Sequence, residues 1–184
     1  YIAADLLSQA EHDTLACSIL LTPSQDIAEK VAVEVDKQLA KLSRNEIAKK
    51  SIESYGRIVV TETMEEAIDL ANEIAPEHLE LAVENPFDYL NKIRNAGAIF
   101  LGEYSPEPLG DYFAGPNHTL PTSGTAKFAS PLSVDAFIKK SSVIYYTREA
   151  LTAVKDKIIR IAESETLTAH ANSIRVRFES DEDE

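Results

Sequence analysis

The chain has 184 residues, 44% of them hydrophobic, which is enough for one medium-sized domain with a buried core. Its 31 acidic and 18 basic residues give a formal net charge of -13, which argues against nucleic acid or an anionic membrane surface as a partner, because both attract basic protein surfaces. No apolar run approaches the roughly 20 residues of a membrane span. The only cysteine, Cys17, excludes a disulfide within the chain and fits a reducing, cytoplasmic setting.

The start of the chain predicts a helix followed by a strand. Residues 5–13 have a helical apolar pattern, and Gln9 and His12 would then lie three residues apart on the same side of that helix. The apolar run 18–22 predicts a short buried strand. The chain lacks an initial methionine, so we expect a fragment or a processed product.

Two further helices and a second strand are expected next. Ser24 is the candidate N-cap of a helix with apolar residues at helical spacing. A helix over 44–55 and a strand over 57–61 follow, and Thr63 begins another helix that reaches about residue 74, with a glutamate at the capping-box position.

The next segment places two polar residues after a helix. Pro76 breaks the preceding helix, so Glu77 and His78 are expected on a turn, where side chains can project into a cleft. A helix over 86–93 and a strand over 98–101 complete this part.

The order of these elements predicts an α/β fold with a mostly parallel sheet flanked by helices, an incomplete Rossmann-like arrangement with a helical carboxyl-terminal appendage. Sites in such sheets lie at the carboxyl ends of the strands. The segment 102–130 is rich in glycine and proline, and loops of that length are commonly functional.

The carboxyl-terminal part is expected to contain a strand over 142–147 and helical structure over 148–171. Its apolar helical face would consist of Leu151, Val154, Ile158 and Ile161. We therefore expect three segments: an α/β domain over 1–135, a strand-helix segment over 136–179, and an acidic tail over 180–184.

The four histidines suggest a metal-assisted acid–base site, because histidine binds metals and titrates near neutral pH. Gln9, His12, Asp111 and His170 would form an oxygen and nitrogen donor set suited to Zn²⁺. Without a thiolate, an open catalytic site is favoured over a closed structural one. Alternatively, Gln9 and His12 only share a solvated helix face.

Glu77 and His78 form an adjacent acid–base pair, in which a glutamate could activate water and a histidine could transfer a proton. The alternative is an ordinary helix start after Pro76. The glycines near Asp111 and His118 would let the backbone bend around a ligand, or they belong to a surface loop. Residues 122–126 could bind an anion or form a plain turn, and no dinucleotide-binding glycine motif is present.

Six motifs follow one another along the chain: DLLSQAEH (5–12), APEHLE (75–80), NAGAIFLG (95–102), GDYFAGPNH (110–118), LPTSGTA (120–126) and LTAH (167–170). Together they closely resemble the histidinol dehydrogenase family. The resemblance runs nearly end to end, yet it would cover only the carboxyl-terminal part of a family chain more than twice this length.

The resemblance implies a zinc-dependent homodimer that oxidises L-histidinol to L-histidine with two NAD⁺ through an aldehyde, histidinal, in the last step of histidine biosynthesis. Gln9, His12 and Asp111 match zinc ligands within one subunit, and His170 matches the ligand donated across the dimer interface. The zinc and its ligands would anchor the amino and imidazole nitrogens of histidinol.

The same resemblance assigns the remaining site residues. Glu77 matches the base that activates water for the second oxidation, and His78 matches the group that handles the proton of the substrate hydroxyl. His118 and Glu165 match substrate-binding positions. By the same resemblance, segment 1–135 would be the partial substrate- and zinc-site domain, and segment 136–179 would be the dimerisation segment.

The family's amino-terminal half, with its NAD-binding domain, is absent from this sequence. We therefore expect a fragment that carries most zinc and acid–base residues but is inactive alone. Two alternatives stay open: a non-catalytic metal-binding dimerisation module, or a related zinc- and NAD-dependent dehydrogenase of another amino or hydroxy alcohol. His118 and Glu165 together favour an imidazole substrate over the latter.

Overall fold

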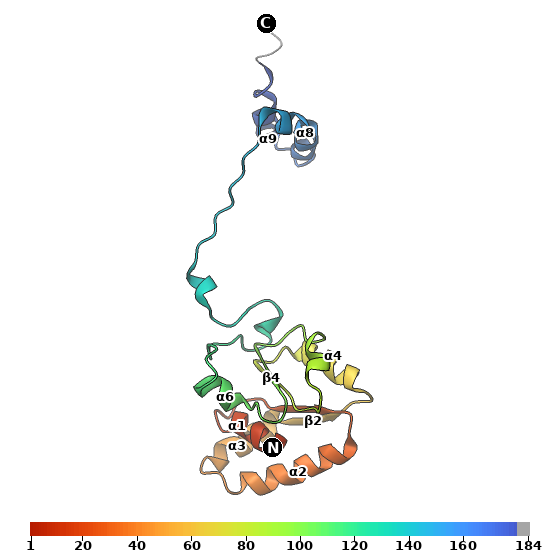
Figure 1. Ribbon diagram of the computed structural model, residues 1–184, viewed down its shortest axis with the longest axis vertical. Helices are drawn as coiled ribbons and strands as arrows, with labels where there is room; N and C mark the ends of the chain where they lie inside the picture. Colours follow the sequence, from red (N-terminus) through yellow and green to blue (C-terminus); the bar gives the residue numbers. More distant parts are fainter. Residues whose placement is uncertain (180–184) are drawn as a thin grey trace. The chain divides into compact units, whose positions relative to one another are not determined.

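The computed structural model describes residues 1–179, and its helices and short parallel strands form an α/β fold, as expected (Figure 1). The chain divides into two compact units, residues 1–138 and residues 139–184. The run 180–184, expected to be an acidic tail, lies outside the described residues. The roles assigned to the three sequence segments stay predictions.

The first half of unit 1, residues 1–63, is built mainly from three helices around a parallel strand pair. Its elements are α1 (Ile2–Ala10), β1 (Ile19–Thr22), α2 (Gln25–Leu39), α3 (Asn45–Tyr55) and β2 (Arg57–Val60). β1 and β2 pair in parallel, with Ile19 opposite Arg57 and Thr22 opposite Val60. Helix α1 packs against both α2 and α3 (Figure 1).

An apolar core and a side-chain cap stabilise this half. Ala3, Leu7, Val31 and Val35 are buried together between α1 and α2. Ser24 caps α2, since its hydroxyl accepts a hydrogen bond from the Ile27 N–H at 3.3 Å, which confirms the predicted N-cap. Ala3 belongs to this core although it precedes the helix that the sequence predicted over 5–13.

Helix α1 differs from its expected range. It begins at Ile2 and ends at Ala10, whereas the sequence predicted a helix over 5–13. The prediction that Gln9 and His12 share one helix was therefore wrong: Gln9 lies in the last turn, and His12 lies in the turn that follows. The cause is local, because Asp13 accepts the Leu15 N–H and supports a turn instead of a continued helix.

The second half of unit 1, residues 64–138, carries a second parallel strand pair. Its main elements are α4 (Met64–Ile74), β3 (His78–Leu81), α5 (Phe87–Leu90), β4 (Ala98–Leu101) and α6 (Glu107–Tyr112). β3 and β4 pair from His78 opposite Ala98 to Leu81 opposite Leu101. In the described chain the strands form two separate pairs, not one continuous sheet.

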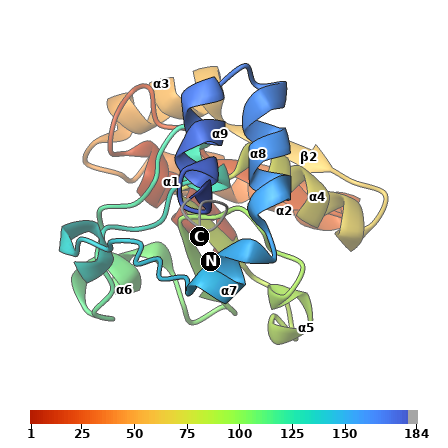
Figure 2. The same cartoon turned by 90° about the horizontal axis from the view of Figure 1, so that it is seen from above.

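Several details of this half correct the sequence predictions. The turn expected at Glu77 and His78 is only partly right, because His78 is the first residue of β3. The segment 102–130, expected to be irregular, contains α6 and a short 3₁₀-helix, Thr125–Lys127. Helix α5 is shorter than expected, and α5 and α6 lie at different margins of unit 1 (Figure 2).

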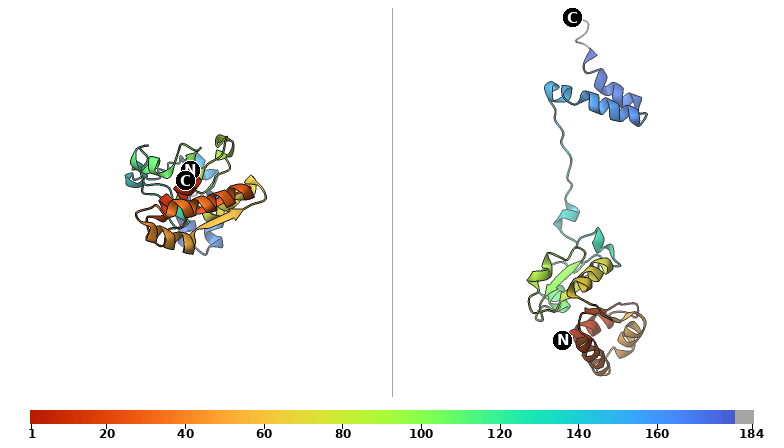
Figure 3. Two further views of the ribbon diagram at one scale, coloured as in Figure 1. Left: turned by 90° about the horizontal axis from the view of Figure 1, so that it is seen from below. Right: turned by 90° about the vertical axis from the view of Figure 1, so that its right-hand side faces the viewer.

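Unit 2 is helical, with α7 (Arg148–Thr152), α8 (Lys155–Ser164) and α9 (Thr168–Arg175), and α8 packs beside α9 (Figure 3). The strand predicted over 142–147 was wrong, since these residues have no regular secondary structure. Their β-branched and aromatic side chains favour a strand, but the described part of unit 2 offers no strand to pair with.

The apolar face predicted for this unit was also partly wrong. Ile161 is 62% exposed, whereas its neighbour Ala162 is buried. A small side chain thus occupies the packed position of α8, which allows close approach of a neighbouring segment. No helix in residues 1–179 is both long and apolar enough to cross a membrane.

Candidate functional site

Three side chains in the second half of unit 1 converge and form what we call the donor group: His78, Glu107 and Asp111. One nitrogen or oxygen atom from each lies within 4.8 Å of the others. His78 comes from the start of β3, and the two carboxylates come from α6, where a spacing of four residues places them on one side of the helix. The distance from His78 Nε2 to Asp111 Oδ1 is 4.0 Å.

The ring nitrogen of His78 has an unusual environment. Its Nε2 atom is buried and has no hydrogen-bond partner. Buried polar atoms almost always have a partner, so an unpaired nitrogen beside two carboxylates suits a site that receives a cation or a substrate group. Phe100 provides an apolar wall, with its ring centroid 6.0 Å from that of His78.

Burial and like charges perturb the acidic groups around this site. Burial raises the pKa of Glu107, and the negative charge of Asp111 raises it further, while His78 and His12 act in the opposite direction. Glu107 therefore holds its proton more readily than an exposed glutamate unless a positive charge binds beside it.

Glu80, on β3 two residues beyond His78, is the most perturbed of these groups. Burial raises its pKa to about 7, and the nearby carboxylates of Asp5 and Glu107 add to the effect. Its hydrogen bond from the Glu107 N–H, at 2.9 Å, acts in the opposite direction. This carboxyl group consequently changes charge near neutral pH.

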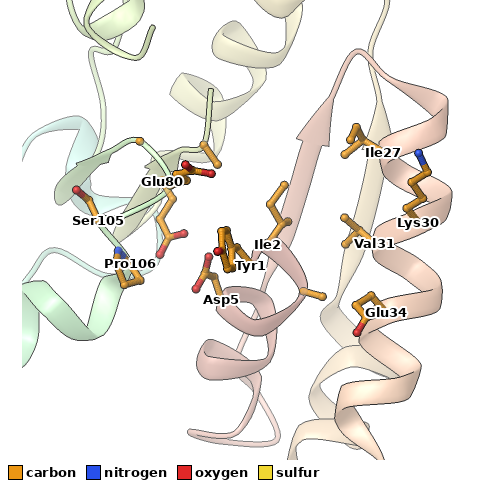
Figure 4. A pocket seen from close by; sticks show the side chains of 14 residues that line it. Tyr1, Ile2, Asp5, Ile27, Lys30, Val31, Glu34, Glu80, Ser105 and Pro106 are labelled. Carbon is orange, nitrogen blue, oxygen red and sulfur yellow. The ribbon is translucent and has the colours of Figure 1, made fainter. Parts of the chain in front are cut away.

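A cavity of about 380 Å³ lies next to this region, between α1, α2 and the end of β3. Figure 4 shows Glu80 and Asp5 pointing toward one another across it, with Pro106 beside them. The donor group does not line this cavity.

Two glycines leave no room for a side chain next to the site. A Cβ atom on Gly110 would lie 2.7 Å from Cε1 of Phe100, and one on Gly97 would lie 2.5 Å from the carbonyl oxygen of Glu77. The Gly97 N–H also donates to the carbonyl oxygen of Pro76 at 2.9 Å. The backbone immediately before His78 is therefore held in close contact with Gly97.

Of the residues predicted to form the site, the structure brings His78 and Asp111 together. Gln9 is half-buried at the end of α1, and His12 is exposed but close enough to Glu107 to lower the pKa of that carboxyl group. Glu77 is half-buried immediately before β3.

The other three predicted site residues come from the segment after α6 and from unit 2. His118 is exposed on the irregular segment after α6, and unit 2 carries Glu165 at the end of α8 and His170, exposed, on α9. The site roles of all eight residues stay predictions.

The sequence reasoning missed Glu107 and Glu80. A signal for Glu107 was present, because Pro106 and Pro108 flank it and proline is common in the first turn of a helix. A helix starting there would have placed Glu107 and Asp111 on the same side. Glu80 could have been found from the alternation in His78–Leu81, which is typical of a strand.

Comparisons with known proteins give one consistent result. The family model described as histidinol dehydrogenase matches residues 1–178. The histidinol dehydrogenase of Caldanaerobacter subterraneus subsp. tengcongensis is 62% identical over 181 residues, covering 98% of this chain and 42% of the relative. That of Clostridium acetobutylicum is 61% identical over 178 residues, covering 97% of this chain and 41% of the relative.

A solved structure extends the similarity to the fold. The crystal structure of histidinol dehydrogenase from Elizabethkingia anophelis matches with a TM-score of 0.84 and 42% sequence identity, over 97% of this chain and 41% of that one. The chain thus spans about two fifths of the length of the relatives it matches.

Proposed function

The chain belongs to the histidinol dehydrogenase family, and we propose that it forms part of a zinc- and NAD-dependent enzyme that oxidises L-histidinol to L-histidine through histidinal. The observation that supports this most is the family match over residues 1–178, in which the donor group lies. We place the enzyme in histidine biosynthesis and in the cytoplasm.

The donor group fits a divalent cation by its chemistry. It offers the carboxylates of Glu107 and Asp111, which are oxygen donors suited to Zn²⁺ and similar ions, and it keeps the unpaired ring nitrogen of His78 beside them for proton transfer. Asp111 also belongs to the zinc ligands implied by the sequence, together with Gln9, His12 and a His170 from a second copy of the chain. When bound, zinc would supply charge that orients the amino and imidazole nitrogens of histidinol.

The residues beside the donor group would carry the proton transfers. In the first oxidation His78 would accept the proton of the substrate hydroxyl, a role that its unpaired ring nitrogen allows. In the second, Glu77 would accept a proton from the water that adds to the aldehyde. His118 and Glu165 would bind the substrate.

NAD⁺ would accept the hydride in each oxidation, and we place its site in the part of the relatives' length that this chain does not cover. The chain covers 42% of the Caldanaerobacter relative, so more than half of such a protein lies outside the match. We therefore expect this chain alone to bind zinc as a dimer but not to reduce NAD⁺.

The first test measures zinc by elemental analysis and mass by light scattering on this chain. Near-stoichiometric zinc in a dimer is the expected result, since His170 would come from the partner. Zinc-free protein would contradict a metal site within this chain, and a zinc-bound monomer would contradict the donation of His170 across an interface.

The second test concerns turnover. We expect no NADH from histidinol with this chain, and NADH formation with a relative of full length. In that relative, glutamine at the position matching Glu77 should impair the aldehyde-to-acid step far more than the first oxidation, with the position matching the exposed Glu84 as control. Turnover by this chain would refute the placement of the NAD site. Unchanged kinetics would refute the role of Glu77 as the base of the second oxidation.

A further inference from the structure

We propose that Glu80 is a positioning residue that holds α6, the helix carrying both carboxylates of the donor group, against the strand that carries its imidazole. This inference rests on the proposed metal-assisted function of that group. Glu80 is not itself a member of the donor group.

The contact that carries the proposal is a hydrogen bond at the start of α6. Oε1 of Glu80 accepts the N–H of Glu107, the first residue of the helix, at 2.9 Å. The first N–H groups of a helix have no partner within it, and the preceding Pro106 offers no side-chain acceptor. Glu80 therefore takes the place of a capping residue, although it lies 27 residues earlier in the chain.

Through this hydrogen bond, β3 and α6 hold the imidazole and the two carboxylates of the donor group in position relative to one another. Glu80 and His78 are two residues apart on one strand, so their side chains leave the same face. Glu107 and Asp111 follow one another by one helical turn. One hydrogen bond thus joins the strand bearing the imidazole to the helix bearing both carboxylates.

Helix α6 depends on such outside support. It has only six residues, Glu107–Tyr112, and isolated helices of that length are unstable in water. Gly110 contacts the ring of Phe100 so closely that a Cβ atom there would lie 2.7 Å from Cε1. The Glu80 hydrogen bond adds a directional restraint at the end of the helix where Glu107 lies.

Glu80 also connects this pair of elements to α1. Its carboxyl group lies close enough to that of Asp5 to be affected by its charge, and the two residues face one another in the cavity (Figure 4). Asp5 lies four residues before Gln9 on α1, so Glu80 lies beside the elements of unit 1 that carry the donor-group residues and Gln9. A single side chain can therefore set the spacing of the site.

Cobalt titration of three variants tests the proposal, because the visible spectrum of Co²⁺ reports its coordination. Glu80→Ala removes the acceptor, whereas Glu80→Gln keeps an oxygen that can accept the Glu107 N–H. Glu103→Ala is the matched control, since Glu103 lines the same cavity but interacts with Tyr104.

We expect Glu80→Ala to weaken Co²⁺ binding roughly 10- to 100-fold, as loss of an outer partner does at other metal sites, and to change the spectrum. Glu80→Gln should restore binding to within about threefold and restore the spectrum. Unchanged binding and an unchanged spectrum in Glu80→Ala would overturn the proposal, as would equal losses in both Glu80 variants.

Amide hydrogen exchange separates this inference from the proposed function. If the unaltered chain does not bind Co²⁺, the metal site fails, but the positioning role is still tested at the Glu107 amide. That amide should exchange roughly fivefold faster in Glu80→Ala than in Glu80→Gln, consistent with one lost hydrogen bond. Amides of α2 should be unchanged, which excludes global unfolding. Equal Glu107 exchange in both variants would refute the positioning role.

Discussion

The two halves of unit 1 differ in what they bury. The first half packs apolar side chains, among them Leu7 at 2% exposure and Val35 at 6%. The second half encloses ionisable side chains, His78 and Glu80, whereas the buried polar residues of the first half, such as Ser18 and Ser51, are uncharged. The first arrangement favours stability, and the second favours binding and proton transfer at some cost in stability.

Not every buried polar residue in the second half lowers the stability of the fold. Asn72, 3% exposed, accepts the N–H groups of Arg94 and Asn95 through Oδ1 and donates to the carbonyl oxygen of Lys92. All of its polar atoms are therefore satisfied, unlike Nε2 of His78. Within this half, Asn72 therefore has a structural role, whereas His78 has a free ring nitrogen beside two carboxylates.

The largest expected effect comes from opening the apolar core. Leu7→Ala should lower the free energy of unfolding by about 2–5 kcal/mol, because it leaves a cavity between α1 and α2. Urea denaturation measures the loss, with Leu15→Ala as control, since Leu15 is 71% exposed. A loss below about 1 kcal/mol would show that this half does not depend on its apolar core.

The next effect distinguishes binding from stability. Asp111→Asn should weaken zinc binding at least as much as the roughly 10- to 100-fold typical of an outer-shell change, with little change in unfolding. Calorimetric titration measures the affinity, and Asp88→Asn on the exposed surface of α5 is the control. Equal zinc affinity in both variants would remove Asp111 from the proposed ligands.

The perturbed carboxyl group in the second half predicts a pH dependence of stability. In the folded chain the pKa of Glu80 is raised from 4.5 to about 7. Below pH 4.5 the group is protonated in both the folded and the unfolded chain, so its stabilising contribution is complete, and the folded chain loses stability as the pH rises toward about 7. Because the group is partly exposed, we expect a loss of about 1–2 kcal/mol.

Metal-free protein provides the measurement, as the difference in unfolding free energy between the unaltered chain and Glu80→Gln from pH 4 to pH 8. The glutamine variant should gain relative stability as the pH rises. A constant difference across this range would contradict the raised pKa.

The smallest loss of stability should be the same for one helix in each half, α2 and α4. Ser24→Ala and Thr63→Ala each remove a side-chain cap, at α2 and at α4, where the Thr63 hydroxyl accepts the Glu66 N–H at 3.1 Å. Each should cost about 1 kcal/mol, since the lost hydrogen bond is local. Thermal unfolding of the two variants measures the costs, and a much larger loss at Thr63 would show that α4 supports the site more directly.

The sequence predicted the elements whose signals are local. The helices after Ser24 and Thr63 were found because a cap and a periodic apolar face lie within a few residues of each other. The strand expected over 142–147 failed because a strand depends on a partner, which composition does not reveal. Whether such a segment forms a strand depends on contacts with distant segments, which a local sequence pattern does not show.

In the candidate site too, local sequence signals predicted some residues, and others depend on contacts between distant segments. The residue types at Glu77, His78 and Asp111 drew attention to these segments, and the structure brings Nε2 of His78 and Oδ1 of Asp111 to 4.0 Å. Glu107 was missed because its role depends on the rotation of α6, which Glu80 sets from another part of the chain. Tertiary hydrogen bonds of this kind have no signature in a local pattern.

Gly97 has a consequence for experiments that change every position in turn. It carries no side chain that could bind or react, yet any Cβ atom there would collide with the carbonyl oxygen of Glu77 at 2.5 Å. Saturation mutagenesis scored by activity would find no tolerated replacement and would rank this position with the reacting groups. Loss of activity on substitution of Gly97 would therefore report a steric clash with the backbone and not a chemical role of this residue.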